Sequence, residues 1–217
     1  MKYLFSNKIK LVLICLASFS LLSCENQTKT DNTDEQSNKT EELVKEVEAL
    51  AFDTQNITIN WTGYKKTEKT PVKGVFQVAN VSNIKSSSNI VEALNGVEFE
   101  IPVSSIFSKN EDRDSKLQEL FFGVMDNTLS LKGSLTLEEN GDGYIDLLMN
   151  GVQNKLAIKY QSFDDSLSLS GILDLIDWKA EEAVKSLNEA CLDLHKGDDG
   201  LSKTWSEVAV SATIRVK

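Results

Sequence analysis

The amino-acid sequence predicts an all-β domain built from an antiparallel sheet, because apolar and polar residues alternate over most of its length. From residue 57 onward, apolar side chains recur at every second position in about eight runs. Such alternation is typical of strands with one buried and one solvated face, the usual condition of antiparallel sheets. Turn-forming pairs such as Asn95-Gly96 and Asn150-Gly151 separate the runs. The pattern therefore favours a closed barrel or a sandwich.

The strands expected from this alternation occupy, in chain order, residues 57–61, 72–78, 97–103, 129–137, 145–149, 156–160, 167–175 and 208–216. Two further segments have apolar residues at every third or fourth position, which predicts amphipathic helices over residues 113–125 and 178–195. Asp177 is the expected N-cap of the second helix, and Gly197 follows its predicted end.

Residues 1–23 have the composition of a secretory signal peptide. Lys2 and Lys8 precede an apolar run that is shorter than the ~20 residues of a membrane-spanning helix. The run ends in Leu21-Leu22-Ser23-Cys24, which resembles the lipobox of bacterial lipoproteins. This resemblance implies cleavage before Cys24 and acylation of the Cys24 thiol. The alternative is an ordinary signal peptide in which the cysteine occurs by chance.

Residues 24–55 are expected to form an acidic tether ahead of a folded domain over residues 56–217. Residues 25–40 contain no apolar side chain, and residues 25–55 carry nine acids and three lysines. A segment of this composition cannot build a core of its own. Leu43, Val47 and Leu50 have helical spacing, which predicts a short helix within the tether, either packed on the domain or isolated.

The composition also disfavours several classes of function. A net charge of −10 disfavours binding to a nucleic-acid backbone. One histidine and three cysteines leave few ligands for a zinc site, and we expect no metal. A Ser-His-Asp triad would have to use His195, the only histidine, and the chain has no Gly-x-Ser-x-Gly motif. An envelope hydrolase is thus the weakest of the functions considered.

Several motifs, in the same order along the chain, resemble the YceI-like family. They are Trp61-Thr62-Gly63-Tyr64, Val72-Lys73-Gly74-Val75-Phe76, Ser105-Ile106-Phe107, Arg113-Asp114, Phe121-Phe122 and Gly133-Ser134-Leu135-Thr136-Leu137. The resemblance covers nearly all of residues 57–217. Lys116 stands where the family has a histidine near the Arg-Asp motif, and residues 176–204 form a longer helical insertion than in the simplest members.

The resemblance implies an antiparallel lipocalin-like β-barrel of about eight strands with two short helices. It also implies an apolar tunnel that binds a long isoprenoid lipid, such as a polyprenyl phosphate or an isoprenoid quinone, and no catalytic residues. Together with Cys24, it implies a lipid-anchored protein of a Gram-negative cell envelope, on the periplasmic side or the outer surface. We therefore expect an apolar lipid and the membrane as partners, with no nucleic acid; the sequence leaves a homodimer open.

The predicted lining of the tunnel is aromatic, and it consists of Trp61, Phe76, Phe99, Phe121 and Phe122. A structural or interaction lipoprotein with a filled barrel would need the same inward residues, so this alternative stays open. Glycines at 63, 74, 133 and 171 favour a cavity, because glycine on an inner face leaves space. Arg113 is the candidate contact for a lipid headgroup; otherwise Arg113 and Asp114 would form a surface pair or a contact at a helix start.

Overall fold

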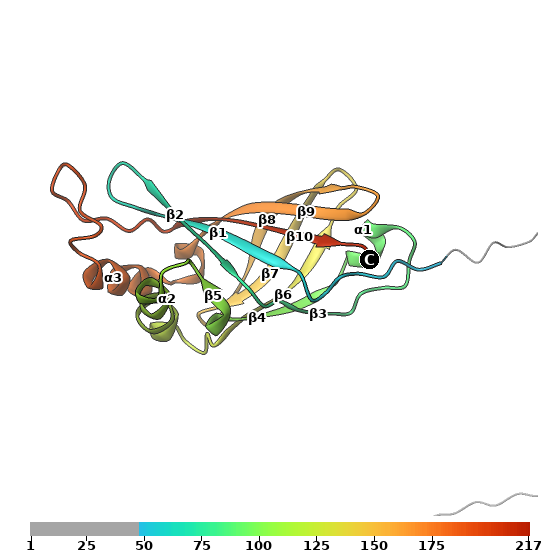
Figure 1. Cartoon of the computed structure of the whole chain (residues 1–217), viewed down its shortest axis with the longest axis horizontal. Coiled ribbons are helices and arrows are strands. Elements are labelled where there is room, and N and C mark those ends of the chain that lie inside the picture. Colours follow the sequence, from blue (N-terminus) through green and yellow to red (C-terminus); the bar gives the residue numbers. More distant parts are fainter. Residues whose placement is uncertain (1–47) are drawn as a thin grey trace, which may run out of the picture. The chain divides into compact units, whose positions relative to one another are not determined.

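Ten β-strands form one antiparallel sheet in the computed structural model, which describes residues 48–217 (Figure 1). The strands are β1 (Thr58–Lys65), β2 (Thr70–Phe76), β3 (Asn80–Ser82), β4 (Glu98–Pro102), β5 (Ile106–Phe107), β6 (Ser130–Leu137), β7 (Asp142–Met149), β8 (Val152–Ser162), β9 (Ser166–Asp174) and β10 (Glu207–Arg215). Their order across the sheet is β3-β4-β6-β7-β8-β9-β10-β1-β2-β5. The predicted signal peptide, Cys24 and most of the predicted tether lie outside the described residues.

The sheet curls into a half-barrel, and the all-β, lipocalin-like prediction is confirmed (Figure 1). The two strands that alternation alone did not reveal are β3 and β5, with three and two residues. They stand at the two ends of the strand order, so the described sheet does not close on itself. A helical segment after β5 covers the inner face instead, where Phe122 packs against Phe76 at 6.1 Å between ring centroids.

The helices are short and lie between strands. They are α1 (Ile90–Leu94), the 3-10 turn η1 (Val103–Ser105), α2 (Glu111–Lys116), the π-helical turn η2 (Leu117–Phe121), the 3-10 turns η3 (Phe122–Val124) and η4 (Leu175–Trp178), and α3 (Glu181–Ala190). The predicted helix over residues 113–125 corresponds to α2, η2 and η3, which follow one another without a gap. Asn110 begins this segment, because its side-chain oxygen accepts a hydrogen bond from the backbone N–H of Arg113.

The second predicted helix, over residues 178–195, is wrong in its cap and its bounds. Asp177 lies within η4, and Asp174 is the residue whose carboxylate accepts a hydrogen bond from the backbone N–H of Ile176. Lys179 adopts a left-handed conformation with φ of 54°, which separates η4 from α3. Consequently α3 starts at Glu181 without a side-chain cap and ends at Ala190, short of the predicted residue 195.

The folded domain begins before the predicted residue 56. The backbone N–H of Leu50 donates to the carbonyl of Ser87 at 2.9 Å, and that of Lys217 donates to Ala51 at 2.8 Å. Phe52 is buried and forms a β-bridge with Val216. These apolar side chains join the core, which holds the segment on the sheet. Residues 48–50 are not helical, and the rest of the predicted tether helix lies outside the described residues.

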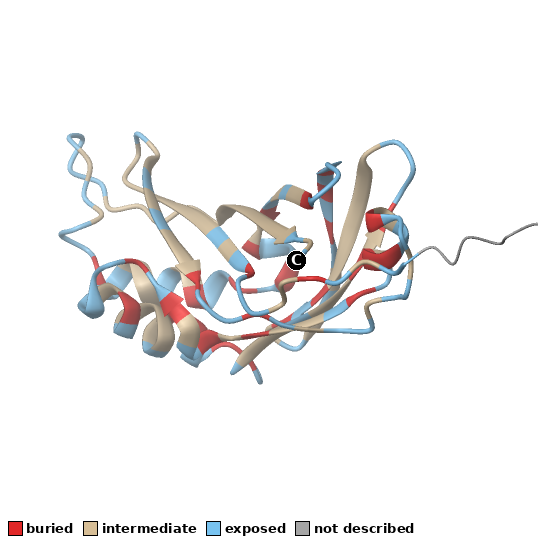
Figure 2. Cartoon of the chain, turned by 45° about the vertical axis from the view of Figure 1, so that its right-hand side comes forward, coloured by how far each residue is buried: buried red, intermediate tan, exposed pale blue. Residues whose placement is uncertain are grey.

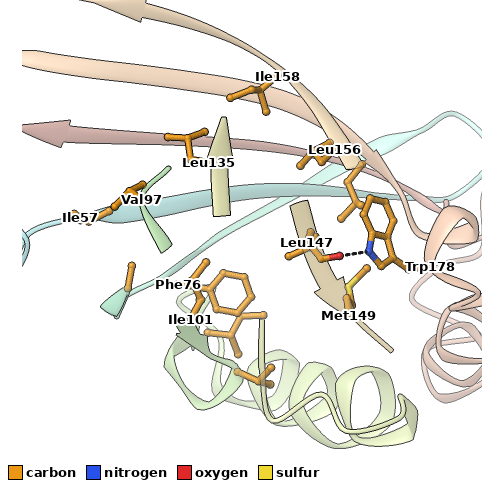
Figure 3. Close-up of a cluster of buried hydrophobic side chains, with 14 of the residues drawn as sticks. Ile57, Phe76, Val97, Ile101, Leu135, Leu147, Met149, Leu156, Ile158 and Trp178 are labelled. Atoms are coloured by element: carbon orange, nitrogen blue, oxygen red, sulfur yellow. Dashed lines mark hydrogen bonds between the residues drawn. The ribbon is translucent and has the colours of Figure 1, made fainter. Parts of the chain in front are cut away.

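The core lies on the concave face of the sheet, and buried residues alternate with exposed ones along several strands (Figure 2). Trp178 is its largest fully buried side chain, at 1% exposure. The indole Nε1–H of Trp178 donates to the carbonyl oxygen of Leu147 at 2.9 Å (Figure 3). Trp178 thereby fixes the turn η4 against strand β7 through both burial and a hydrogen bond.

We expect Trp178→Phe to lower the free energy of unfolding by about 2–4 kcal/mol, because it removes a buried hydrogen bond and part of a buried ring. Trp61→Phe is the matched control, since the buried Nε1 of Trp61 has no hydrogen-bond partner among the described residues. The free energy of unfolding should fall less in Trp61→Phe than in Trp178→Phe, by at least about 1 kcal/mol. Urea unfolding of both variants measures the difference, and equal losses would contradict this account of Trp178.

Candidate ligand-binding site

A cavity of about 720 Å³ lies between the concave face of the sheet and the helical segments. Its volume falls within the range typical of small-molecule sites, ~300–1,000 Å³. The deep part of the cavity is apolar, with a wall that includes Ile101, Leu147, Met149, Leu156, Leu173 and Leu175. A completely filled barrel, the alternative left open by the sequence, has no such space.

The walls follow from the alternation of each strand. In β1, Ile59, Trp61 and Gly63 line the cavity at every second position. Their register partners across the neighbouring strand β2 are Phe76, Gly74 and Val72. Residues directly opposite each other in an antiparallel pair project to the same face, so Ile59 and Phe76 both point into the cavity, while Trp61 and Val72 each lie opposite a glycine.

The five aromatic residues predicted to line a tunnel all line this cavity. They come from β1, β2, β4 and the segment after α2. Phe121 and Phe122 pack edge to face at 4.9 Å between ring centroids, and Phe122 also contacts Phe76. Whether these residues bind a ligand stays a prediction.

Two of the glycines expected to leave empty space instead make room for aromatic rings. A Cβ atom on Gly74 would lie 2.2 Å from Cζ2 of Trp61, and one on Gly133 would lie 2.3 Å from the backbone oxygen of Asp146 and 2.7 Å from Cζ of Phe99. Backbone oxygens crowd the corresponding position on Gly171, where Ala157 O would be 2.7 Å away. Of the four glycines expected to leave space, only Gly63 has no atom within 4 Å of its Cβ position. The glycines therefore position the lining aromatics more than they enlarge the cavity.

One part of the cavity wall carries charge. Four cationic residues line it, and they are Lys65, Lys73, Arg113 and Lys116. The single acidic residue of the lining, Asp112, pairs with Lys116 at 2.6 Å between Nζ and Oδ2. The Nζ of Lys65 donates to the carbonyl oxygen of Leu194 at 3.1 Å. This charged rim, defined by the four cations and Asp112, is thus positive although the chain as a whole is acidic.

Arg113 and Asp114 have different environments. Arg113 is part of the rim, where it is partly exposed. Asp114 is buried, and its carboxylate accepts hydrogen bonds from both the backbone N–H and the hydroxyl of Ser108. Asp114 therefore ties the start of α2 to the end of β5, in keeping with the helix-start alternative, while Arg113 lines the cavity.

His195 lies at the rim, but its side chain is engaged in a structural hydrogen bond. Its Nδ1 is 2.7 Å from the hydroxyl of Thr204, which donates in turn to Oδ1 of Asn188 at 3.0 Å. Because Thr204 uses its proton on Asn188, Nδ1 of His195 is the donor. Burial, followed by the charge of Lys65, lowers the pKa of His195 to about 4. Among the described residues, the hydroxyl group that is hydrogen-bonded to His195 is that of Thr204 and not that of a serine.

No helix within residues 48–217 has both the length and the apolar character that crossing a bilayer requires. In the same part of the chain, no group of three or more His, Cys, Asp or Glu side chains could hold a metal ion.

The model of the YceI-like domain family matches residues 50–216. This chain belongs to the YceI-like family. The match includes Leu50 and Phe52, in agreement with the early start of the folded domain. It also covers every residue of the rim and all five predicted lining aromatics. No curated protein matches this YceI-like chain.

The solved structures that are similar to this YceI-like domain have low sequence identity to it. One is a polyisoprenoid binding domain from Saccharophagus degradans implicated in plant cell wall breakdown, with 12% identity, a TM-score of 0.57, and coverage of 78% of this chain and 98% of that one. BcnA from Burkholderia cenocepacia has 9% identity, a TM-score of 0.49, and coverage of 77% and 100%. A YCEI protein from Campylobacter jejuni has 20% identity, a TM-score of 0.43, and coverage of 64% and 84%.

The depressed pKa of His195 predicts a loss of stability in mild acid. Below its ordinary pKa of 6.5, the histidine of the unfolded chain takes up a proton that the folded chain binds only near pH 4. The stability that neutral His195 contributes to the folded chain is fully present above pH 6.5, and it is lost as the pH falls toward 4. Since His195 is partly exposed, we expect no more than about 1–2 kcal/mol.

His195→Asn keeps a donor to Thr204 and removes the titration. The difference in unfolding free energy between pH 7 and pH 4.5, measured in urea, should therefore be smaller in the variant than in the wild type. Identical differences in the two proteins would contradict the assignment.

Proposed function

We propose that this chain is a membrane-anchored lipoprotein of a Gram-negative cell envelope that binds a long isoprenoid-type lipid inside its half-barrel, for carriage, storage or stress protection. The observation that carries the proposal is the apolar cavity of about 720 Å³. Membership of the YceI-like family supports the ligand class, as does the description of the Saccharophagus degradans neighbour as polyisoprenoid binding.

The deep cavity suits a hydrocarbon chain. Its deep wall consists of aliphatic side chains such as Ile101, Leu147 and Leu156, and these offer no hydrogen bonds to a ligand. Burying an apolar chain there stabilises the complex by about 25 cal/mol per Å² of area removed from water. The lipid tail therefore occupies the deep cavity, and its polar end stays at the rim.

The rim favours a lipid with an anionic headgroup. Lys65 and Arg113 line it with no salt-bridge partner among the described residues, whereas Lys116 is paired with a carboxylate. Arg113 presents a guanidinium, whose planar array of donors matches phosphate oxygens. Between the two ligand types that the family resemblance implies, the rim thus supports a polyprenyl phosphate over a quinone, which carries no charge.

Purification of the protein from its own membranes, followed by mass spectrometry of the bound lipid, tests the ligand class. We expect an isoprenoid lipid to co-purify. With added ligands, Arg113→Gln should weaken binding of a polyprenyl phosphate about tenfold, because a charge-assisted hydrogen bond contributes ~1.5–3 kcal/mol. Binding of the corresponding polyprenol should hardly change.

Arg215→Gln is the matched control, since Arg215 is exposed at the end of β10 and does not line the cavity. It should leave both affinities unchanged. A protein that purifies empty and takes up no added isoprenoid would refute the proposal. An equal effect of Arg113→Gln on the phosphate and the alcohol would refute the headgroup assignment alone.

Cys24 is the proposed site of the lipid anchor, and residues 1–23 are the proposed signal peptide. Acyl chains contribute about 0.8 kcal/mol for each buried methylene group, so several of them hold a protein stably on a membrane. We expect Cys24→Ser to move the protein from the membrane fraction to the soluble fraction and to abolish incorporation of labelled palmitate. Cys15→Ser, within the proposed signal peptide, is the control and should change neither the membrane fractionation nor the palmitate incorporation. Retention of the label in Cys24→Ser would exclude acylation at Cys24.

A further inference from the structure

A second, smaller cavity of about 120 Å³ continues the first along the inner face of the sheet. Five residues line both cavities, and they are Ile59, Phe99, Ile101, Ile145 and Val210. Beyond them, the lining of the second cavity includes Leu94, the last residue of α1. Figure 3 shows Ile57, Val97 and Leu135 of the second cavity on one side, and Leu147, Met149 and Leu156 of the first on the other.

Phe99 is the largest side chain in the wall that the two cavities share. It lies on β4 opposite Gly133 of β6, and its ring covers the position that a Cβ on Gly133 would take, 2.7 Å from Cζ. The Phe99 ring can lie close to β6 because Gly133 has no side chain there. The other four shared residues are aliphatic and shorter, so truncation of Phe99 opens the widest passage.

We propose that Phe99 is the residue that sets the length of lipid chain that the protein accepts. This rests on the proposed function, since it concerns how far an isoprenoid tail penetrates. With the Phe99 ring in place, the tail ends in the first cavity. Without the ring, the two cavities become continuous, and a longer tail reaches the space next to α1.

The second cavity offers room for a defined extension of the chain. A cavity of 120 Å³ has the volume of about four waters, each of which takes up ~30 Å³ in the liquid. This is room for about one isoprene unit of five carbons. Along β10, Val210 lines both cavities and Ile214 lines only the second. These two residues are roughly 13 Å apart along β10 at the usual rise of a strand.

The test measures the affinity of the full-length protein for a series of polyprenyl phosphates that differ by one isoprene unit. For the wild type, affinity should rise with chain length and then level off once the first cavity is full. In Phe99→Ala the levelling should occur at chains longer by at least one unit, which fill the second cavity. Phe163→Ala is the matched control, because Phe163 is 55% exposed and lines neither cavity.

Phe99→Leu provides a second variant if Phe99→Ala does not fold, since leucine keeps an apolar wall while opening part of the passage. A shift of the length limit in either folded variant, absent in Phe163→Ala, supports the proposal. An unchanged limit in the folded variants overturns it while leaving isoprenoid binding intact. A wild-type protein that binds none of the series overturns the proposed function and the role of Phe99 together.

Discussion

The antiparallel pairing of β1 with β10 joins two separate groups of strands into one curved wall. β3, β4 and β6 to β10 form a single run of neighbours, while β1, β2 and β5 form another, and only the β1–β10 contact connects them. It sets Trp61 opposite Val210, so the two inner faces meet at the cavity. Because the paired strands come from opposite ends of the domain, the pairing costs loop-closure entropy, which burial of the inner faces must offset. The cavity therefore depends on the complete sheet.

Pairs of an aromatic residue and a glycine shape the cavity within this wall. Trp61 lies over Gly74 and Phe99 lies over Gly133, each across one strand pair. The absence of a side chain on one strand lets a large ring from the next lie close to the sheet instead of projecting far into the interior. The cavity can therefore stay open although many aromatic side chains line it. Without the glycines, the same rings would project into the interior and fill it.

Much of the sheet and of the cavity lining could be predicted from the sequence because period-two alternation reports directly which side chains face inward. Trp61, Phe76 and Phe99 lie at such positions, and all three line the cavity. The strands β3 and β5 escaped prediction because two or three residues carry no detectable period. The interruption of the helix between η4 and α3 depends on the left-handed backbone conformation of Lys179. A lysine in the sequence does not predict this conformation. The roles of Gly74 and Gly133 depend on cross-strand register, which becomes visible only in the folded sheet.

The bridge between Phe52 and Val216 brings the beginning and the end of the folded domain together. β10 runs from Glu207, near the rim, toward Arg215 at the opposite end, where the C-terminus and the incoming residue 48 both lie (Figure 1). A domain immobilised on a solid support through either terminus therefore directs its opening away from the support. Fusion partners or labels at the C-terminus likewise leave the path of an incoming lipid unobstructed.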